Sequence, residues 1–446
     1  MRTRDREFDP TMSEERETRQ MASTTVVQPK NDDLSKVSPS MSAGDTLGKP
    51  GGGGWRRAIG TVRQMPATRL QMTASVAALV VVALIFEVQT SLFLSPRNIT
   101  ELLLQSVEVG VMALGMTFVL LVGEIDLSVA ALAAVCATVT ASAISIHHMG
   151  TIEGILLGLA TGVIFELVQA ALITILGAPS FVVTLGGSLA LSGILLMILP
   201  SAEEIPLDGT RLGSLSADFV SSAVAWPLII LGVAIFAVLR TIAYSEVKRG
   251  SSDGGPSLGK TVILPTAVVA ALAIVAETLL NSYLGVPLFL VIFIGMLVVS
   301  SYVTTQTRFG VHLYAVGGSR PAANRAGISP RKAIFSAFAL NGLFAGAAGI
   351  LGASRILGVG VQTNSSDLLL VAIAAAVVGG TSLFGGRGNV WGALIGAVLI
   401  EALGNGLDLL GAPTATKYIA EGVVLAVAAI VDAAVNHRWI FSRVGE

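Results

Sequence analysis

Ionisable and amide side chains lie within long apolar stretches of this sequence, where their polar atoms would face hydrocarbon. Such a placement is costly unless the side chain meets a partner or a wet pathway, so these residues are candidate sites. A carboxyl group can accept hydrogen bonds or carry a proton, whereas an amide both donates and accepts hydrogen bonds. The side chains in question are Glu108, Glu166, Asn341, Arg355, Asn364, Glu401, Asn405, Asp408 and Glu421.

Asn341 is the strongest candidate to line a pathway for a polar solute. It lies between Leu340 and Gly342 and offers both kinds of hydrogen-bonding group. The alternative for this residue is a hydrogen bond between two helices. Arg355 and Asp408 lie near the ends of apolar stretches, where a polar side chain can instead reach the membrane interface. The other pathway candidates are Glu108, Glu166 and Glu401.

Asp126 and Ser128 lie in the short sequence GEIDLS, residues 123–128, which separates two apolar stretches. Both side chains can accept hydrogen bonds from the free N–H groups that begin the next helix, so helix capping is one interpretation. The other is a part in solute translocation or in the conformational change that accompanies it. The sequence leaves both interpretations open.

Glycine follows two patterns that have different meanings. Residues 379–388, GGTSLFGGRG, are too rich in glycine for a regular helix and predict a broken helix or a re-entrant turn. Small residues at a spacing of four, in contrast, let helices approach closely within a membrane. This packing interpretation applies to Gly342, Gly346, Gly349, Gly352, Gly392 and Gly396.

No grouping of nucleophile, base and acid is recognisable, so no catalytic residue is predicted. Residues 254–261, GGPSLGKT, fit a phosphate-binding pattern, but they follow a basic linker instead of a strand and run into an apolar stretch. Residues 424–432, VLAVAAIVD, imitate a nucleotide-binding strand within the last apolar stretch. The single cysteine, Cys136, excludes an intrachain disulfide and a cysteine-based metal cluster. We therefore expect no ATP hydrolysis by this chain, no cofactor and no metal ion.

The amino-acid composition indicates the environment in which the protein folds and in which these side chains must be positioned. Of 446 residues, 53% are hydrophobic and 13% are charged, which is typical of a polytopic membrane protein. The net charge of -1 says nothing about partners, and no nucleic acid is expected among them. Apolar stretches of about 20 residues, the length that crosses a bilayer, recur along the chain. They predict an all-α fold with about twelve transmembrane helices near residues 72–92, 102–122, 127–146, 152–176, 181–199, 223–239, 262–280, 287–304, 333–355, 368–383, 390–410 and 419–435.

The charges of the remaining segments predict how the chain lies in the membrane. Residues 1–69 are too polar to fold alone and predict a disordered cytoplasmic tail, with arginines crowded before the first span. An even number of spans places the C-terminus on the same side, together with the basic segments. The predicted parts are a membrane domain at 70–436, a cytoplasmic linker at 240–260, a basic loop at 307–332, an acidic external loop at 200–222 and a cytoplasmic tail at 437–446.

The basic loop, TRFGVHLYAVGGSRPAANRAGISPRK, is the longest polar insert between strongly apolar segments. It contains no acidic residue. Its second half combines Pro321 with small residues and Gly327, which predicts a short helix followed by a turn. These residue types are consistent both with a solvated connector and with a segment presented to a partner.

This loop resembles the cytoplasmic coupling segment of permease subunits of bacterial ATP-binding cassette importers, especially those for ribose, xylose and related monosaccharides. Permeases of this superfamily often carry Glu-Ala-Ala, three residues and then Gly. Ala322, Ala323 and Gly327 match this pattern, and Pro321 stands where the Glu would be. The sequences IDLS and GGTSLFGGRG, and residues 179–186, are also similar to these permeases. Additional apolar residues near 240–280 favour the xylose-like members.

The resemblance implies a permease subunit in the inner or plasma membrane that pairs with a second copy or a close homologue. It further implies a separate ATPase docked inside and an extracytoplasmic binding protein that delivers a monosaccharide. The coupling residues would be Gly317, Gly318, Ala322, Ala323 and Gly327. The alternative is a proton-coupled secondary transporter in which Glu108, Glu166 and Glu401 carry the proton. A membrane enzyme is a third and weaker possibility.

Overall fold

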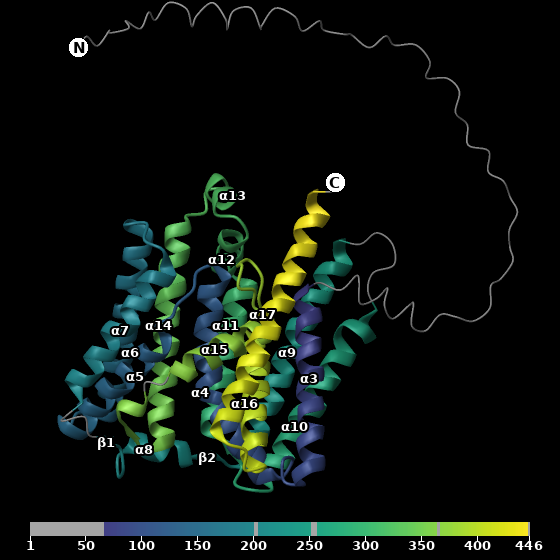
Figure 1. The fold of residues 1–446 in the computed structure, drawn as a ribbon. Coiled ribbons are helices and arrows are strands. Elements are labelled where there is room, and N and C mark those ends of the chain that lie inside the picture. Colours follow the sequence, from purple (N-terminus) through teal and green to yellow (C-terminus); the bar gives the residue numbers. More distant parts are fainter. Residues whose placement is uncertain (1–66, 200–203, 251–256, 364–365, 445–446) are drawn as a thin grey trace, which may run out of the picture. The chain divides into compact units, whose positions relative to one another are not determined.

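The computed structural model describes residues 67–199, 204–250, 257–363 and 366–444, all of which belong to one compact unit. The tail predicted for residues 1–69 therefore lies outside the described residues, except for its last three. Within the described residues the chain is helical apart from short connections and two small pairs of strands (Figure 1). The prediction of an all-α polytopic membrane protein is confirmed.

Eleven helices within the described residues are long and apolar enough to cross a membrane. They are α3 (Ala67–Thr90), α4 (Pro96–Leu121), α5 (Val129–Ala141) with a π-helical turn (Ser142–Ile146), α6 (Thr151–Ile175), α7 (Ser180–Ile198), α9 (Ser222–Gly250), α10 (Leu264–Asn281), α11 (Leu288–Gln306), α14 (Pro330–Ile356), α16 (Trp391–Leu409) and α17 (Thr414–Val444). Each corresponds to one of the stretches predicted from the sequence.

The remaining predicted span, residues 368–383, contains only the 13-residue helix α15 (Ser366–Val378). Such a helix is about 20 Å long at about 1.5 Å per residue, whereas the hydrocarbon core is about 30 Å thick. The glycine-rich residues 379–390 that follow α15 are not helical. The broken helix that this glycine content predicted is therefore present, and it shortens the tenth crossing.

The helix bundle has two ends that carry different structures. At one end lie α12 (Arg308–Gly318) and α13 (Arg320–Arg325), which connect α11 to α14; we call it the α13 end. At the other end, β1 (Ile205–Pro206) pairs antiparallel with β4 (Gly358–Val359), and β2 (Phe219–Val220) pairs antiparallel with β3 (Val286–Pro287). We call this the β1 end. α14 begins at the α13 end and finishes at the β1 end (Figure 1).

The segment predicted as an external loop, residues 200–222, is folded where it is described. It contains β1, the four-residue helix α8 (Arg211–Ser214), a 3-10 turn (Leu215–Ala217) and β2. Two-residue strands are too short to leave an alternating pattern, so they could not be predicted from the sequence. This segment closes the β1 end of the bundle.

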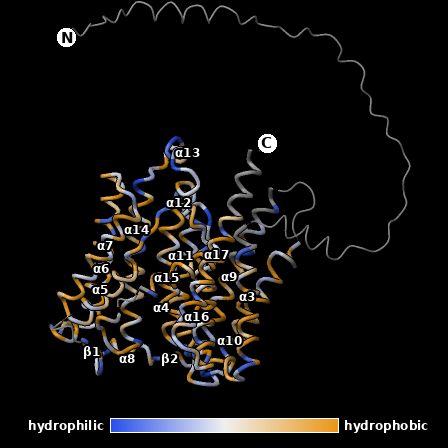
Figure 2. Tube along the Cα trace, in the orientation of Figure 1, coloured by the Kyte–Doolittle hydropathy of each residue, from blue (hydrophilic) through white to orange (hydrophobic). Residues whose placement is uncertain are grey.

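α4, α5 and α14 form the core, because most of their side chains are buried. The outer helices α7, α10 and α17 instead expose apolar side chains such as Leu189, Leu272 and Ile430. Figure 2 colours hydrophobic residues along the helices in orange and the hydrophilic α13 segment in blue. An apolar exterior around a closely packed interior is what a bilayer requires of a helix bundle.

Close helix contacts in this core depend on glycine, as the spacing predicted. A Cβ atom added to Gly342 would lie 2.3 Å from the carbonyl oxygen of Gly162. A Cβ atom added to Gly162 would likewise lie 2.3 Å from the carbonyl oxygen of Gly342. A Cβ atom at Gly349 would lie 2.0 Å from the carbonyl oxygen of Ala133. These glycines therefore hold α14 against α6 and α5 by direct backbone contact. Gly352 differs, because its added Cβ would meet the Glu108 carboxyl group at 2.4 Å.

Helical structure extends into two segments that were predicted as polar connections or tails. α9 continues to Gly250, within the cytoplasmic linker predicted at 240–260, and a π-helical turn begins at Gly259. The C-terminal tail predicted at 437–446 is helical through Val444, as a continuation of α17. Both segments are polar continuations of apolar helices, and polarity alone does not end a helix when no glycine or proline interrupts it.

Candidate functional site

An inner cavity of about 400 Å³ lies among α4, α14, α15 and α16 toward the β1 end. Its lining includes two predicted pathway residues, Glu108 from α4 and Glu401 from α16. The structure thus brings together two carboxyl groups that are far apart in the sequence. The polar lining is completed by Gln105, Arg355, Thr363 and Asp408.

Arg355 and Glu108 form an ion pair within this cavity, with 3.2 Å between the Arg355 Nη2 and Glu108 Oε2 atoms. The Arg355 side chain is 35% exposed and that of Glu108 is 16% exposed, so both charges keep partial access to solvent. Gly352, one helical turn before Arg355, leaves room for the Glu108 carboxyl group against α14. The expectation that Arg355 reaches the interface is therefore incomplete, because its guanidinium group has a partner inside the bundle.

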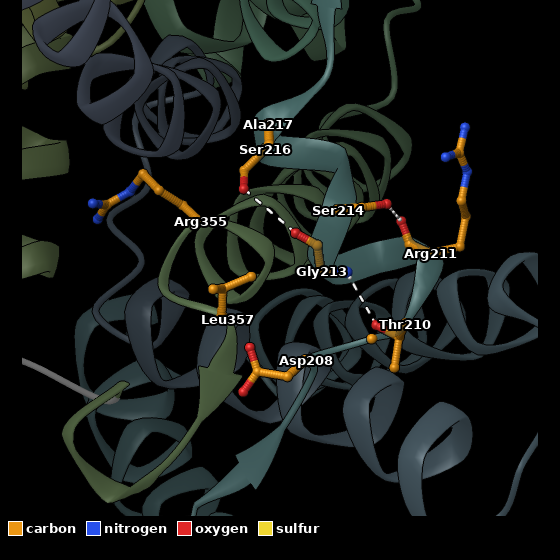
Figure 3. A pocket seen from close by; sticks show the side chains of 10 residues that line it. Asp208, Thr210, Arg211, Gly213, Ser214, Ser216, Ala217, Arg355 and Leu357 are labelled. Atoms are coloured by element: carbon orange, nitrogen blue, oxygen red, sulfur yellow. Dashed lines mark hydrogen bonds between the residues drawn. The ribbon is translucent and has the colours of Figure 1, made fainter.

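An outer cavity of about 560 Å³ adjoins this site at the β1 end. Its lining comes from α8 and the neighbouring turns, including Asp208, Thr210 and Ser216, and from the end of α14 (Figure 3). Arg355 lines both cavities. Its side chain therefore lies at the boundary between an outer chamber and a polar inner chamber.

A second group of polar residues is buried between α5, α6 and α14, and we call it the polar cluster. Asn341 Nδ2 donates to Asp126 Oδ2 at 2.6 Å and lies 3.5 Å from Glu166 Oε1. Ser128 donates to Asp126 Oδ1 from both its hydroxyl group and its backbone N–H, and Gln169 Nε2 donates to the Ser128 hydroxyl oxygen at 2.8 Å. All five side chains are at most 2% exposed.

The polar cluster revises several sequence-based interpretations. Asn341 lines neither cavity and instead bonds between helices, which was the alternative considered for it. Ser128 precedes α5 without any side-chain capping bond, and its hydroxyl group donates to Asp126, so Ser128 does not cap the helix. Asp126 instead accepts the backbone N–H of Ser128 at the start of α5. Glu166, which was grouped with Glu108 and Glu401 as a pathway candidate, lies in this cluster and not in the inner cavity.

Gln169 belongs to the polar cluster but was not identified from the sequence. It lies three residues after Glu166, a spacing that puts both side chains on one face of α6. Asp126 lies in the loop before α5, and burial raises the pKa of its carboxyl group above the ordinary value of 3.8, while the hydrogen bonds from Ser128 oppose this shift. No lysine or arginine of the described residues pairs with the cluster.

The α12–α13 segment has the local structure that its sequence predicted. The Ser319 hydroxyl oxygen accepts a hydrogen bond from the Ala322 N–H, and Pro321 stands in the first turn of α13, where its missing N–H costs nothing. Gly327 follows the helix with a φ of 80°, a conformation that side chains disfavour. Ala322 and Gly327 are exposed, whereas Ala323 is only 4% exposed and packs within its own chain.

Gly317 is a packing residue. A Cβ atom at Gly317 would lie 1.8 Å from the carbonyl oxygen of Leu121, and the same oxygen accepts a hydrogen bond from the N–H of Gly386 at 3.0 Å. Around Gly318, in contrast, an added Cβ would meet no atom within 4 Å. The end of α12, the end of α4 and the glycine-rich segment therefore meet through their backbones at the α13 end.

Arg320 of α13 is bound to the GEIDLS loop. Its Nη2 atom lies 2.7 Å from Glu124 Oε1 and 3.3 Å from the carbonyl oxygen of Gly123. Glu124 is 7% exposed, and Asp126 of the polar cluster follows it by two residues. A single loop therefore joins α13 to the buried residues at the centre of the bundle.

The glycine-rich residues 379–390 are held by Asp432 of α17. The Asp432 carboxyl group accepts hydrogen bonds from the Ser382 hydroxyl group and the Leu383 N–H, and it pairs with Arg387 at 3.5 Å. These contacts give the polar groups of this non-helical segment partners within the protein, which is necessary because a membrane interior offers them no water. Asp432 thus ends the strand-like sequence 424–432 but lies in a helix, which confirms that this sequence is no nucleotide-binding strand.

The remaining candidates are dispersed. Asn405 accepts a hydrogen bond from Asn98, and Asp408 pairs with Lys417 of α17. Glu421 lies on α17 outside the inner cavity. Asn364 and residues 254–256 of the phosphate-loop-like sequence lie outside the described residues, while Gly259–Ile263 is a helical turn that leads into α10. Over the described part of the chain no group of histidine, cysteine and acidic residues is arranged to hold a metal ion.

Comparison with known proteins places this architecture in a family. The family described as branched-chain amino acid transport system / permease component matches residues 98–429. The xylose transport system permease protein XylH of Haemophilus influenzae is 32% identical over 370 residues, which cover 83% of this chain and 98% of that protein. XylH of Escherichia coli K12 is also 32% identical, with coverage of 84% and 94%.

More distant relatives carry the names of other sugars. The ribose import permease protein RbsC of Haemophilus influenzae is 29% identical over 81% of this chain and 93% of its own length. No solved structure matches the chain. The match to the family extends over most of the membrane-spanning helices, from the start of α4 to within α17. The chain therefore belongs to this family of multi-pass membrane permeases, as a permease of the ABC sugar-importer type.

Proposed function

We propose that this chain is the membrane-spanning subunit of an importer that moves a monosaccharide across the inner or plasma membrane. ATP hydrolysis by a separate subunit drives the transport, and an extracytoplasmic binding protein delivers the sugar. The functional unit contains two permease copies. The names of the xylose and ribose relatives support this substrate class.

One observation carries the proposal: α14 connects a docking segment with a polar cavity. The helix begins at Pro330, directly after the α13 segment, and its last turns present Gly352 and Arg355 to the inner cavity. A displacement of α13 is therefore transmitted along one continuous helix to the cavity wall. A permease powered from one side of the membrane needs such a connection, whereas a simple pore does not.

The charges at the two ends support the orientation. The α12–α13 segment and the start of α14 are basic, through Arg308, Arg320, Arg325, Arg331 and Lys332. The described β1-end segment carries Glu204, Asp208 and Asp218 against Arg211. Because basic loops are retained in the cytoplasm, the α13 end faces the cytoplasm, and both chain termini lie on that side.

The ATPase docks on the exposed part of α13. Ala322 and Gly327 are accessible there, and their small size lets another backbone approach closely. Ala323 is buried against its own chain and supports α13 from beneath. Gly317 and Gly318 lie behind the docking surface, where Gly317 fixes the end of α12 against α4.

Co-purification of the ATPase tests this proposal. We expect Ala322→Lys and Gly327→Val to reduce both sugar uptake and recovery of the ATPase with the permease, because the first blocks the surface and the second strains a φ of 80°. Expression and membrane insertion should persist, since α13 lies outside the bundle. Gln306→Lys, at an exposed position at the end of α11, is the matched control and should change neither quantity. Undiminished association and uptake in the α13 variants would reduce this segment to a connector.

A further inference from the structure

The inner cavity has a wall chemistry that suits the hydroxyl groups of a sugar better than a branched aliphatic side chain. The family description refers to branched-chain amino acids, whereas the relatives are named for sugars. A branched aliphatic side chain gains affinity from an apolar wall, and burying it against charged groups forfeits that gain. A sugar hydroxyl group instead donates to carboxylates and accepts from a guanidinium group.

The polar residues of the cavity approach from three helices. On α4, Gln105 and Glu108 are three residues apart and share one face. On α16, Glu401 and Asp408 are seven residues apart, which again places them on one face. α14 contributes Arg355 between them. Donors and acceptors therefore surround the cavity, as the hydroxyl groups around a sugar ring require.

The two cavities share one lining residue, Arg355. Its ion pair with Glu108 is partly solvated, and partly solvated ion pairs contribute little to stability. A solute hydroxyl group can therefore replace the guanidinium group on Glu108 at small cost.

We propose that the inner cavity is a binding site for a neutral, polyhydroxylated solute of monosaccharide size, reached from the outer cavity when Arg355 leaves Glu108. The volume of about 400 Å³ lies within the range of roughly 300–1,000 Å³ that is usual for small-ligand sites. The inference rests on the proposed function for the direction of transport. It adds the position of the site and the residues that form it.

Cysteine labelling suits this chain because its only cysteine, Cys136, is completely buried. In a Cys136→Ser background, Gln105→Cys places a thiol in the inner cavity and His148→Cys places one on the exposed turn after α5, outside both cavities. A membrane-impermeant thiol reagent is applied to vesicles that contain the full transporter. D-xylose, D-ribose and L-leucine are the three test solutes.

We expect D-xylose or D-ribose to slow labelling of Gln105→Cys several-fold and to leave His148→Cys unaffected, while L-leucine protects neither. Protection by L-leucine alone would contradict both the inference and the proposed substrate class. Absence of protection by any solute, in a transporter that still imports the sugar, would overturn the inference and leave the proposed function intact. If the transporter that contains the unaltered chain imported no sugar, the result would instead count against the proposed function.

A kinetic measurement covers the case in which the introduced thiol does not react. Glu401→Gln keeps the shape of the side chain and removes its charge, so the site should bind sugar less tightly and KM for uptake should rise more than kcat falls. Glu153→Gln, at an exposed position in the first turn of α6 and outside the cavity, is the matched control and should leave KM unchanged. An unchanged KM in Glu401→Gln would contradict a solute site at this position.

Discussion

Replacing Arg320 with Glu lowers sugar uptake about tenfold or more, a loss equivalent to about 1.4 kcal/mol of coupling. The substitution places a second carboxyl group where the guanidinium group now lies 2.7 Å from Glu124, which is 7% exposed. Repulsion between the new carboxylate and the buried Glu124 carboxylate separates α13 from the GEIDLS loop. We expect the ATPase still to associate, because the docking residues Ala322 and Gly327 are unchanged. Uptake and ATPase recovery from the same membranes measure both quantities.

The reversed pair distinguishes this contact from a general effect of charge. The double variant Arg320→Glu with Glu124→Arg restores attraction, and we expect it to recover much of the uptake. Arg308→Glu makes the same change of net charge at an exposed position at the start of α12, away from the docking residues of α13, where no ion pair forms among the described residues, and it should have little effect. Equal losses in Arg320→Glu and Arg308→Glu, without recovery in the double variant, would show that the ion pair does not transmit coupling.

Gly317→Ala is expected to destabilise the protein, whereas Gly318→Ala is not. An added methyl group at Gly317 would lie 1.8 Å from the carbonyl oxygen of Leu121 and 2.4 Å from the N atom of Gly386, and neither backbone can rotate away. Overpacking of this kind costs about 1–3 kcal/mol and sometimes more. The neighbouring Gly318 has open space around the same added atom.

Thermal unfolding of the two variants in detergent measures the difference, and uptake reports its consequence. The two substitutions are chemically identical and adjacent on α12, so each controls for the other. Gly317→Ala should unfold at a lower temperature and lose uptake, while Gly318→Ala should resemble the parent. Equal stability of both variants would contradict the close backbone approach at the α13 end.

The individual helices could be predicted from the sequence more accurately than the contacts between them. Long apolar stretches identified every membrane-crossing helix, because length and hydropathy are local properties. The short helix α15 was assigned a full span, since the glycines that end it also belong to an apolar run. The two-residue strands of the β1 end have no periodic signal at all.

The candidate residues could likewise be recognised from the sequence, whereas their grouping in space could not. Glu108, Glu166, Glu401 and Asn341 were chosen because buried polar groups are costly, and each has a polar partner or lines a polar cavity. Their division between the inner cavity and the polar cluster could not be predicted. It depends on how far along each helix the residue lies and which neighbouring helix it faces. Asp126 and Asn341, for example, are 215 residues apart in the chain.

The energy source can be measured directly in proteoliposomes that contain the permease and its ATPase, with the binding protein and radiolabelled D-xylose outside. If α13 receives its motion from an ATPase, ATP enclosed on the α13 side should drive accumulation of the sugar, and a proton ionophore should leave the rate unchanged. Omission of the ATPase should abolish accumulation, and the Arg320→Glu variant should reduce it about tenfold or more. Accumulation that proceeds without ATP and collapses with the ionophore would contradict the account and identify a proton-coupled carrier.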